Sequence, residues 1–143
     1  MSVDPWNIFT GNFGTVGLPY TALVTLLDIG FFFFTTFKVA KARGKHKISA
    51  PFTDGPEEFL RVFRVQMNTL EQMMIHLPLL WISAFAMDDV FAASFGFVWL
   101  FSRIIYARGY YRKAKSRAKG FLLGMVMNAV LFAGAIAGVI ASL

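Results

Sequence analysis

Hydrophobic residues occupy most of this chain in long runs, and polar residues are confined to a few places between and within them. Three of the runs are long enough to cross the roughly 30 Å hydrocarbon layer of a membrane as helices, which takes about 20 residues. A fourth segment is amphipathic in its first half and apolar in its second half. The pattern predicts four membrane-spanning helices, at about residues 16–37, 57–87, 90–111 and 118–142.

The composition supports a membrane protein of the all-α class. The chain has 143 residues, of which 57% are apolar and 15% are charged. A soluble domain typically has about 45–50% apolar and about 25% charged residues. Four helices of the predicted lengths leave no room for a second domain, so we expect one domain, residues 1–143, that forms an integral membrane four-helix bundle.

The distribution of charge predicts how the bundle lies in the membrane. All 14 Lys and Arg residues lie between Lys38 and Lys119, around the first and third connections, whereas the second connection carries Asp88 and Asp89. The first and third connections of such a bundle share one side, which the excess of positive charge makes cytoplasmic. Both termini are then non-cytoplasmic. Because each basic cluster flanks an apolar span, we expect membrane lipid as a partner and no nucleic acid.

A polar stripe interrupts the second predicted helix. Arg61, Arg64, Asn68 and Glu71 follow at spacings of three, four and three, which places all four on one face of a helix. Charged groups within a membrane helix are costly, face the bundle interior or a cavity, and mark functional sites. The stripe therefore predicts a site in the first half of this helix.

Further polar groups are expected at the same, cytoplasmic end of the bundle. They come from the first connection, the first turns of helix two, the last turns of helix three and the start of helix four. Together, cations, a carboxylate and phenols suit a small zwitterion with more than one carboxylate, next to a bilayer that can supply a lipophilic partner. The groups expected here are Arg43, Arg64, Asn68, Glu71, Tyr106, Tyr110 and Arg117.

Polar residues within the apolar parts of the helices allow more than one interpretation. Asp28 could form a structural hydrogen bond to a neighbouring helix, for example to Asn128, or it could belong to a proton or ion path in a small transporter. His76 could be packed in the interior or act as a ligand. We expect no metal site, because the chain has no Cys and because Glu71 and His76, five residues apart, lack a metal-binding spacing.

Two motifs resemble the MAPEG family, the membrane-associated proteins in eicosanoid and glutathione metabolism. The first is GPEEF at residues 55–59 with RVFRVQMN at residues 61–68 and the following Glu71. The second is FSRIIY at residues 101–106 with Gly109, Tyr110 and Arg117. The resemblance covers roughly residues 43–124, and it is specific because the two motifs lie on different helices at matching separation.

The resemblance implies a homotrimer that binds glutathione between neighbouring subunits near the cytoplasmic face. Arg117 would lie beside the thiol and stabilise the thiolate, because an arginine in its charged form cannot act as a base. Gln66, about 160° away from the stripe at 100° per residue, would serve the neighbouring subunit's site. The residues that would bind glutathione are Arg43, Arg64, Gln66, Asn68, Glu71, Tyr106 and Tyr110.

The activity implied by this resemblance is a detoxifying glutathione transferase or peroxidase. Glutathione would be the cosubstrate, and a hydrophobic electrophile or a lipid hydroperoxide would be the second substrate. The family also contains a non-catalytic member that presents lipid to another enzyme. A membrane scaffold that binds a lipid or another ligand is therefore the alternative function.

Overall fold

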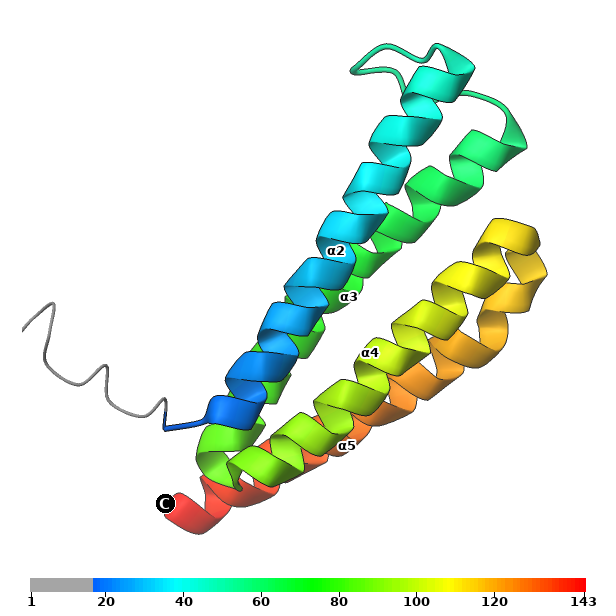
Figure 1. The fold of residues 1–143 in the computed structure, drawn as a ribbon. Coiled ribbons are helices and arrows are strands. Elements are labelled where there is room, and N and C mark those ends of the chain that lie inside the picture. The colour runs from blue at the N-terminus through cyan, green and yellow to red at the C-terminus, as the bar shows by residue number, and fades with distance from the viewer. Residues whose placement is uncertain (1–16) are drawn as a thin grey trace, which may run out of the picture.

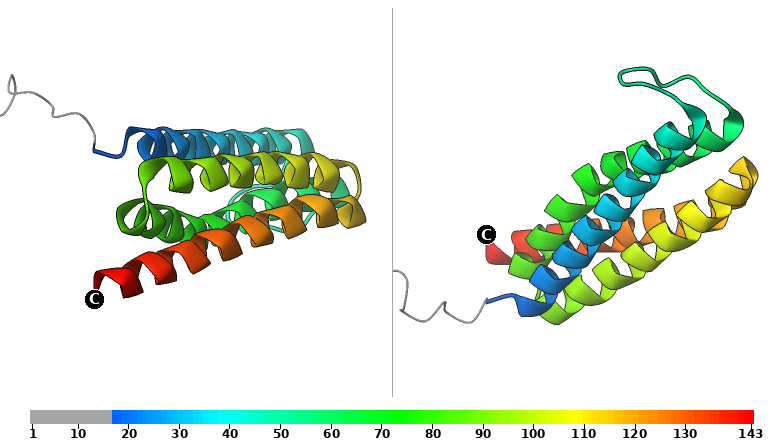
Figure 2. Two further views of the ribbon diagram at one scale, coloured as in Figure 1. Left: turned by 90° about the horizontal axis from the view of Figure 1, so that it is seen from below. Right: turned by 45° about the horizontal axis from the view of Figure 1, so that its top comes forward.

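The computed structural model describes residues 17–143. Four long helices run antiparallel to their chain neighbours: α2 (Pro19–His46), α3 (Glu57–Ala86), α4 (Asp89–Arg112) and α5 (Ala118–Ser142), with the short 3-10 helix η1 (Ala114–Arg117) before α5. The connections α2–α3 and α4–α5 lie at one end of the bundle, and the α3–α4 connection and the C-terminus lie at the other (Figure 1, Figure 2). The predicted all-α four-helix bundle is confirmed.

The first helix is longer than the sequence predicted. We expected it to end at Phe37, but α2 continues to His46, and the connection to α3 begins only at Lys47. The additional turns contain Lys and Arg, which form helices well and interact favourably with the C-terminal end of the helix dipole. Lys47 ends the helix in a left-handed conformation with a φ of 55°. The basic residues placed in the first connection, Arg43 included, therefore belong to α2.

Within residues 17–143, three segments are long and apolar enough to cross a membrane: α2, α4 and the segment Ala114–Ser142 that contains η1 and α5. The sequence predicted α3 as a fourth membrane span, but α3 is not apolar enough over a sufficient length to meet the same criterion. The reason is its first half, which contains two acidic residues at the helix start followed by the polar stripe. The polar residues of α3 are therefore concentrated in the half that follows the α2–α3 connection.

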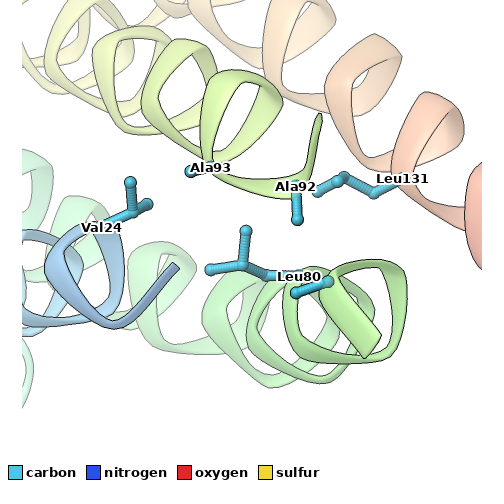
Figure 3. Packing of buried hydrophobic residues seen from close by; sticks show 6 residues of the cluster. Val24, Leu80, Ala92, Ala93 and Leu131 are labelled. Atoms are coloured by element: carbon cyan, nitrogen blue, oxygen red, sulfur yellow. The ribbon is translucent and has the colours of Figure 1, made fainter. Parts of the chain in front are cut away.

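All four helices contribute to the apolar core. Val24 of α2, Leu80 of α3, Ala92 of α4 and Leu131 of α5 pack against one another in the half of the bundle away from the α2–α3 connection (Figure 3). Small residues let α5 approach its neighbours closely. A Cβ atom at Gly120 would overlap the backbone of α4 at Tyr106, as expected for a helix whose glycines recur at four-residue spacing.

A buried polar cluster connects the four helices within their apolar part. The Nε2 atom of His76 lies 3.4 Å from Oδ2 of Asp28, and its Nδ1 atom lies 2.9 Å from Oδ1 of Asn128. The His76 ring stacks on the indole of Trp99, with 3.7 Å between the ring centroids. A direct hydrogen bond between Asp28 and Asn128 is therefore the wrong expectation: His76 lies between them. We call these four residues the interior cluster.

Candidate functional site

Three segments form a small cavity at the end of the bundle that holds the α2–α3 and α4–α5 connections. The first half of α3, the last turns of α4 and the end of η1 enclose about 240 Å³. The helical spacing within α3 and α4 directs the polar faces of both helices toward this space, and the tight turn at η1 brings the start of α5 next to them. We call it the polar pocket, and it is lined by Arg64, Met67, Asn68, Glu71, Tyr106, Tyr110 and Arg117.

Hydrogen bonds fix the amide of Asn68 at the back of the polar pocket. Its Nδ2 atom donates to Oε2 of Glu71 at 3.2 Å, and its Oδ1 atom accepts from Nη2 of Arg103 at 3.2 Å. The same Arg103 nitrogen also donates to Oγ1 of Thr69 at 3.2 Å. The orientation of Asn68, and with it the position of the Glu71 carboxylate, is therefore set by a residue of the neighbouring helix.

Arg103 is the residue of this site that sequence reasoning missed. The sequence placed Arg103 near the end of the third helix but gave it no role. In the structure its side chain is only 1% exposed, and its guanidinium lies 4.1 Å from the ring centroid of Tyr106. A signal was present, since Arg103, Tyr106 and Tyr110 share one helical face at spacings of three and four.

Each of the two tyrosines of the polar pocket has a guanidinium over its ring. Arg103 covers Tyr106, and the Cζ atom of Arg117 lies 4.9 Å from the ring centroid of Tyr110. Such cation–π contacts contribute about 0.5–2 kcal/mol, depending on how far the cation is removed from water. The tyrosines also touch each other, with 5.6 Å between ring centroids. Arg117 is thus held against the pocket wall although its connecting segment is exposed.

The polar pocket contains charges that the chain itself does not neutralise. Within residues 17–143, neither Arg64 nor Arg117 forms an ion pair, and Glu71 contacts only the amide of Asn68. All three charged side chains are exposed. Two free guanidiniums and one free carboxylate can bind a small molecule that carries both carboxylate and ammonium groups.

Two of the eight predicted site residues lie outside the polar pocket of this chain. The Nη1 atom of Arg43 donates to the carbonyl oxygen of Phe52 at 2.7 Å, and its guanidinium lies 5.5 Å from the ring centroid of Phe59. Gln66 is half-buried on another face of α3. Arg61, the fourth residue of the stripe, also lies outside and pairs with Glu57 at 2.9 Å.

The described part of the chain contains no group of three His, Cys, Asp or Glu side chains that could hold a metal ion. The guanidiniums, the carboxylate and the phenols of the polar pocket can bind charged groups and stabilise a developing negative charge. Arg117 and Arg64 supply the positive charge for both tasks, and the phenols of Tyr106 and Tyr110 supply hydrogen bonds.

Comparison with known proteins gives one family and several relatives. The MAPEG family matches residues 21–137. A protein of Synechocystis without an assigned activity is 42% identical over 86% of this chain and 90% of its own length. Microsomal glutathione S-transferase 2 of Mus musculus is 36% identical over 82% of this chain and 80% of its own length. Leukotriene C4 synthase of Cavia porcellus is 40% identical over 67% of this chain and 64% of its own length.

Proposed function

Because the chain belongs to the MAPEG family and is a membrane protein, we propose that it is a glutathione transferase with glutathione peroxidase activity. Relatives named as a glutathione S-transferase and as leukotriene C4 synthase support this assignment. The observation that carries it is the polar pocket, where the stripe of α3 faces two tyrosines and Arg117.

The charges of the polar pocket complement those of glutathione, which has two carboxylates and one ammonium group. Arg64 offers a planar guanidinium for a carboxylate, and Glu71 offers a carboxylate for the ammonium group. Asn68, held by Arg103, lies next to Glu71 and adds directed hydrogen bonds. Arg117 lines the same pocket from the end of η1, against the ring of Tyr110, where it would face the thiol.

Arg117 would activate the thiol by electrostatics. A thiolate is the nucleophilic form, and a nearby cation lowers the pKa of a thiol by stabilising that form. The thiol proton would leave to solvent, since the guanidinium of Arg117 is already fully protonated. The thiolate sulfur then forms a bond to an electrophilic carbon, whose leaving group departs with the electron pair of the broken bond.

The same thiolate could attack a lipid hydroperoxide. The sulfur bonds to one peroxide oxygen, the O–O bond breaks, and the lipid oxygen takes a proton and leaves as an alcohol. A second glutathione then displaces water from the oxidised sulfur and forms the disulfide. Both reactions need the bound glutathione next to a lipophilic phase, which the bilayer around the apolar helices provides.

The proposal includes a homotrimer in which neighbouring subunits complete each site. Arg43 and Gln66 lie outside the polar pocket of their own chain, as expected of residues that serve a neighbour's site. In this proposal the end with the α2–α3 and α4–α5 connections faces the cytoplasm and both termini lie on the other side, which the excess of Lys and Arg around these connections supports.

A non-catalytic scaffold that binds lipid is the second candidate. It is favoured by an apolar groove of about 420 Å³ between α3 and α5, whose walls include Met74, Ile75, Met125 and Phe132. Such a groove would bind the hydrophobic part of a lipid with or without subsequent chemistry. The two candidates differ in whether bound glutathione becomes a thiolate.

Glutathione titration of the purified protein in neutral detergent separates the candidates. We expect saturable binding, together with the ultraviolet absorbance of a thiolate at a pH where free glutathione is a thiol. Arg117→Ala should abolish the absorbance while calorimetry still detects binding, and Arg108→Ala, an exposed arginine outside the pocket, should change neither. Binding without a thiolate signal in the unmodified protein would support the scaffold instead.

A further inference from the structure

A second, larger cavity adjoins the polar pocket at the same end of the bundle. It has a volume of about 590 Å³ and lies between the first turns of α3, the end of α4 and η1. Arg64 and Tyr110 line both spaces. We call it the basic cavity, and its charged lining residues are Glu57, Arg61, Arg64, Arg112, Lys113 and Lys115.

Positive charge dominates the basic cavity and is not neutralised by the chain. Five of the charged lining residues are basic and one is acidic. The acidic residue, Glu57, is already paired with Arg61. Within residues 17–143, Arg64, Arg112, Lys113 and Lys115 form no ion pair, and the buried Nε atom of Arg61 has no hydrogen-bond partner. Cations that share one cavity repel one another, so a bound anion would lower the energy of this arrangement.

Glutathione in the polar pocket would not account for this charge. In the proposed function, Arg64 and Glu71 match one carboxylate and the ammonium group, and Arg117 faces the thiol, all within the polar pocket. Arg112, Lys113 and Lys115 line only the basic cavity and would remain without a counter-charge. These three cations call for an additional anion whether or not the proposed enzymatic activity is correct.

We propose that the basic cavity binds the anionic head group of a bilayer lipid, through the oxygens of its phosphate or carboxylate. The position favours a lipid over a soluble anion, because the apolar helix α4 ends at Arg112 and the apolar segment that contains α5 begins at Ala114. The cavity therefore lies at the level where lipid head groups begin. Exposed Leu60 adds an apolar wall beside the cations.

Native mass spectrometry of the full chain in neutral detergent tests the proposal. The probes are phosphatidylglycerol, oleate, phosphatidylcholine and inorganic phosphate. We expect saturable binding of phosphatidylglycerol or oleate. Tighter binding of phosphatidylglycerol would indicate a phosphate site, and tighter binding of oleate would indicate a carboxylate site. Lys113→Gln combined with Lys115→Gln should weaken this binding roughly thirtyfold, from about 1 kcal/mol for each basic residue near an anionic lipid.

A matched double variant distinguishes lipid binding in the basic cavity from attraction of lipid by the overall positive charge at this end of the bundle. Lys41→Gln combined with Arg108→Gln removes the same charge from exposed positions that line no part of the basic cavity, and it should leave lipid binding unchanged. Equal weakening by both double variants would overturn the proposal, as would equally tight binding of phosphatidylcholine. Displacement of phosphatidylglycerol by an equal concentration of inorganic phosphate would also overturn it, because the ligand would then be a soluble anion.

Discussion

The interior cluster and the polar pocket both place polar side chains among apolar helices, but they differ in burial and in whether the chain itself supplies the neighbours of those side chains. Asp28, His76 and Trp99 are at most 1% exposed, and contacts within the cluster join all four helices. In the polar pocket, Arg64 and Arg117 are exposed and form no ion pair within the described residues.

The difference indicates two roles for similar residue types. A polar group buried away from water is costly unless it has a partner, so Asp28, His76 and Asn128 depend on one another inside the folded chain. Both carboxylate oxygens of Asp28, Nε2 of His76 and Nε1 of Trp99 still lack a hydrogen bond, so little tolerance for further loss remains there. An exposed charge keeps its hydration until a ligand replaces the water, so the polar pocket can remain open without destabilising the bundle. We therefore expect substitutions in the first region to change stability and substitutions in the second to change binding.

The largest effect is expected in the interior cluster. His76→Ala removes the ring that lies against the carboxyl of Asp28 and the amide of Asn128. Leaving buried polar groups unsatisfied costs about 1–3 kcal/mol, or more for a charged group, and the space left beside Trp99 adds a further loss. Denaturant unfolding in detergent should show this loss in the free energy of unfolding, while the glutathione affinity of the folded fraction stays unchanged. The double variant Asp28→Leu with His76→Leu should lose less, because no buried carboxyl is left without its neighbour. If His76→Ala were as stable as the unmodified protein, a structural role of the interior cluster would be contradicted.

An intermediate effect is expected in the polar pocket. Arg64→Ala removes a charged hydrogen-bond donor, which contributes about 1.5–3 kcal/mol to binding, so the dissociation constant of glutathione should rise roughly tenfold to a hundredfold. Its unfolding free energy should change by no more than about 0.5 kcal/mol, because Arg64 is exposed and unpaired. Calorimetric titration measures the dissociation constant of glutathione. Glu71→Ala should raise it to a similar extent. Unchanged affinity in both variants would mean that glutathione binds elsewhere.

The smallest effect is expected for Arg61, the residue of the stripe that lies outside the polar pocket. Arg61→Gln breaks the pair with Glu57, an acidic side chain that is 89% exposed, and such surface pairs contribute about 0–1 kcal/mol. The dissociation constant of glutathione should therefore change less than about twofold, because the proposed glutathione contacts of the stripe begin at Arg64. A tenfold loss of affinity would contradict this prediction, because Arg61 would then belong to the glutathione site.

Features that depend on local periodicity could be predicted from the sequence. Helical spacing placed Arg64, Asn68 and Glu71 on one face, and hydropathy placed Tyr106 and Tyr110 at the same end of the bundle. The structure brings all five together with Arg117. The end of α2 was missed because hydropathy reports where the apolar span stops, whereas helix propensity continued the helix to His46.

The sequence by itself determined the class of the fold and the end of the bundle at which charge collects, because the length of apolar runs and the spacing of polar residues are local properties. Only the tertiary structure decided which polar residues become partners. Arg103 reaches Asn68 across 35 positions of the chain, and His76 reaches Asn128 across 52. Such contacts depend on how one helix is positioned and rotated against another, and that is fixed by the packing of whole surfaces, including the close approach of α5 at Gly120.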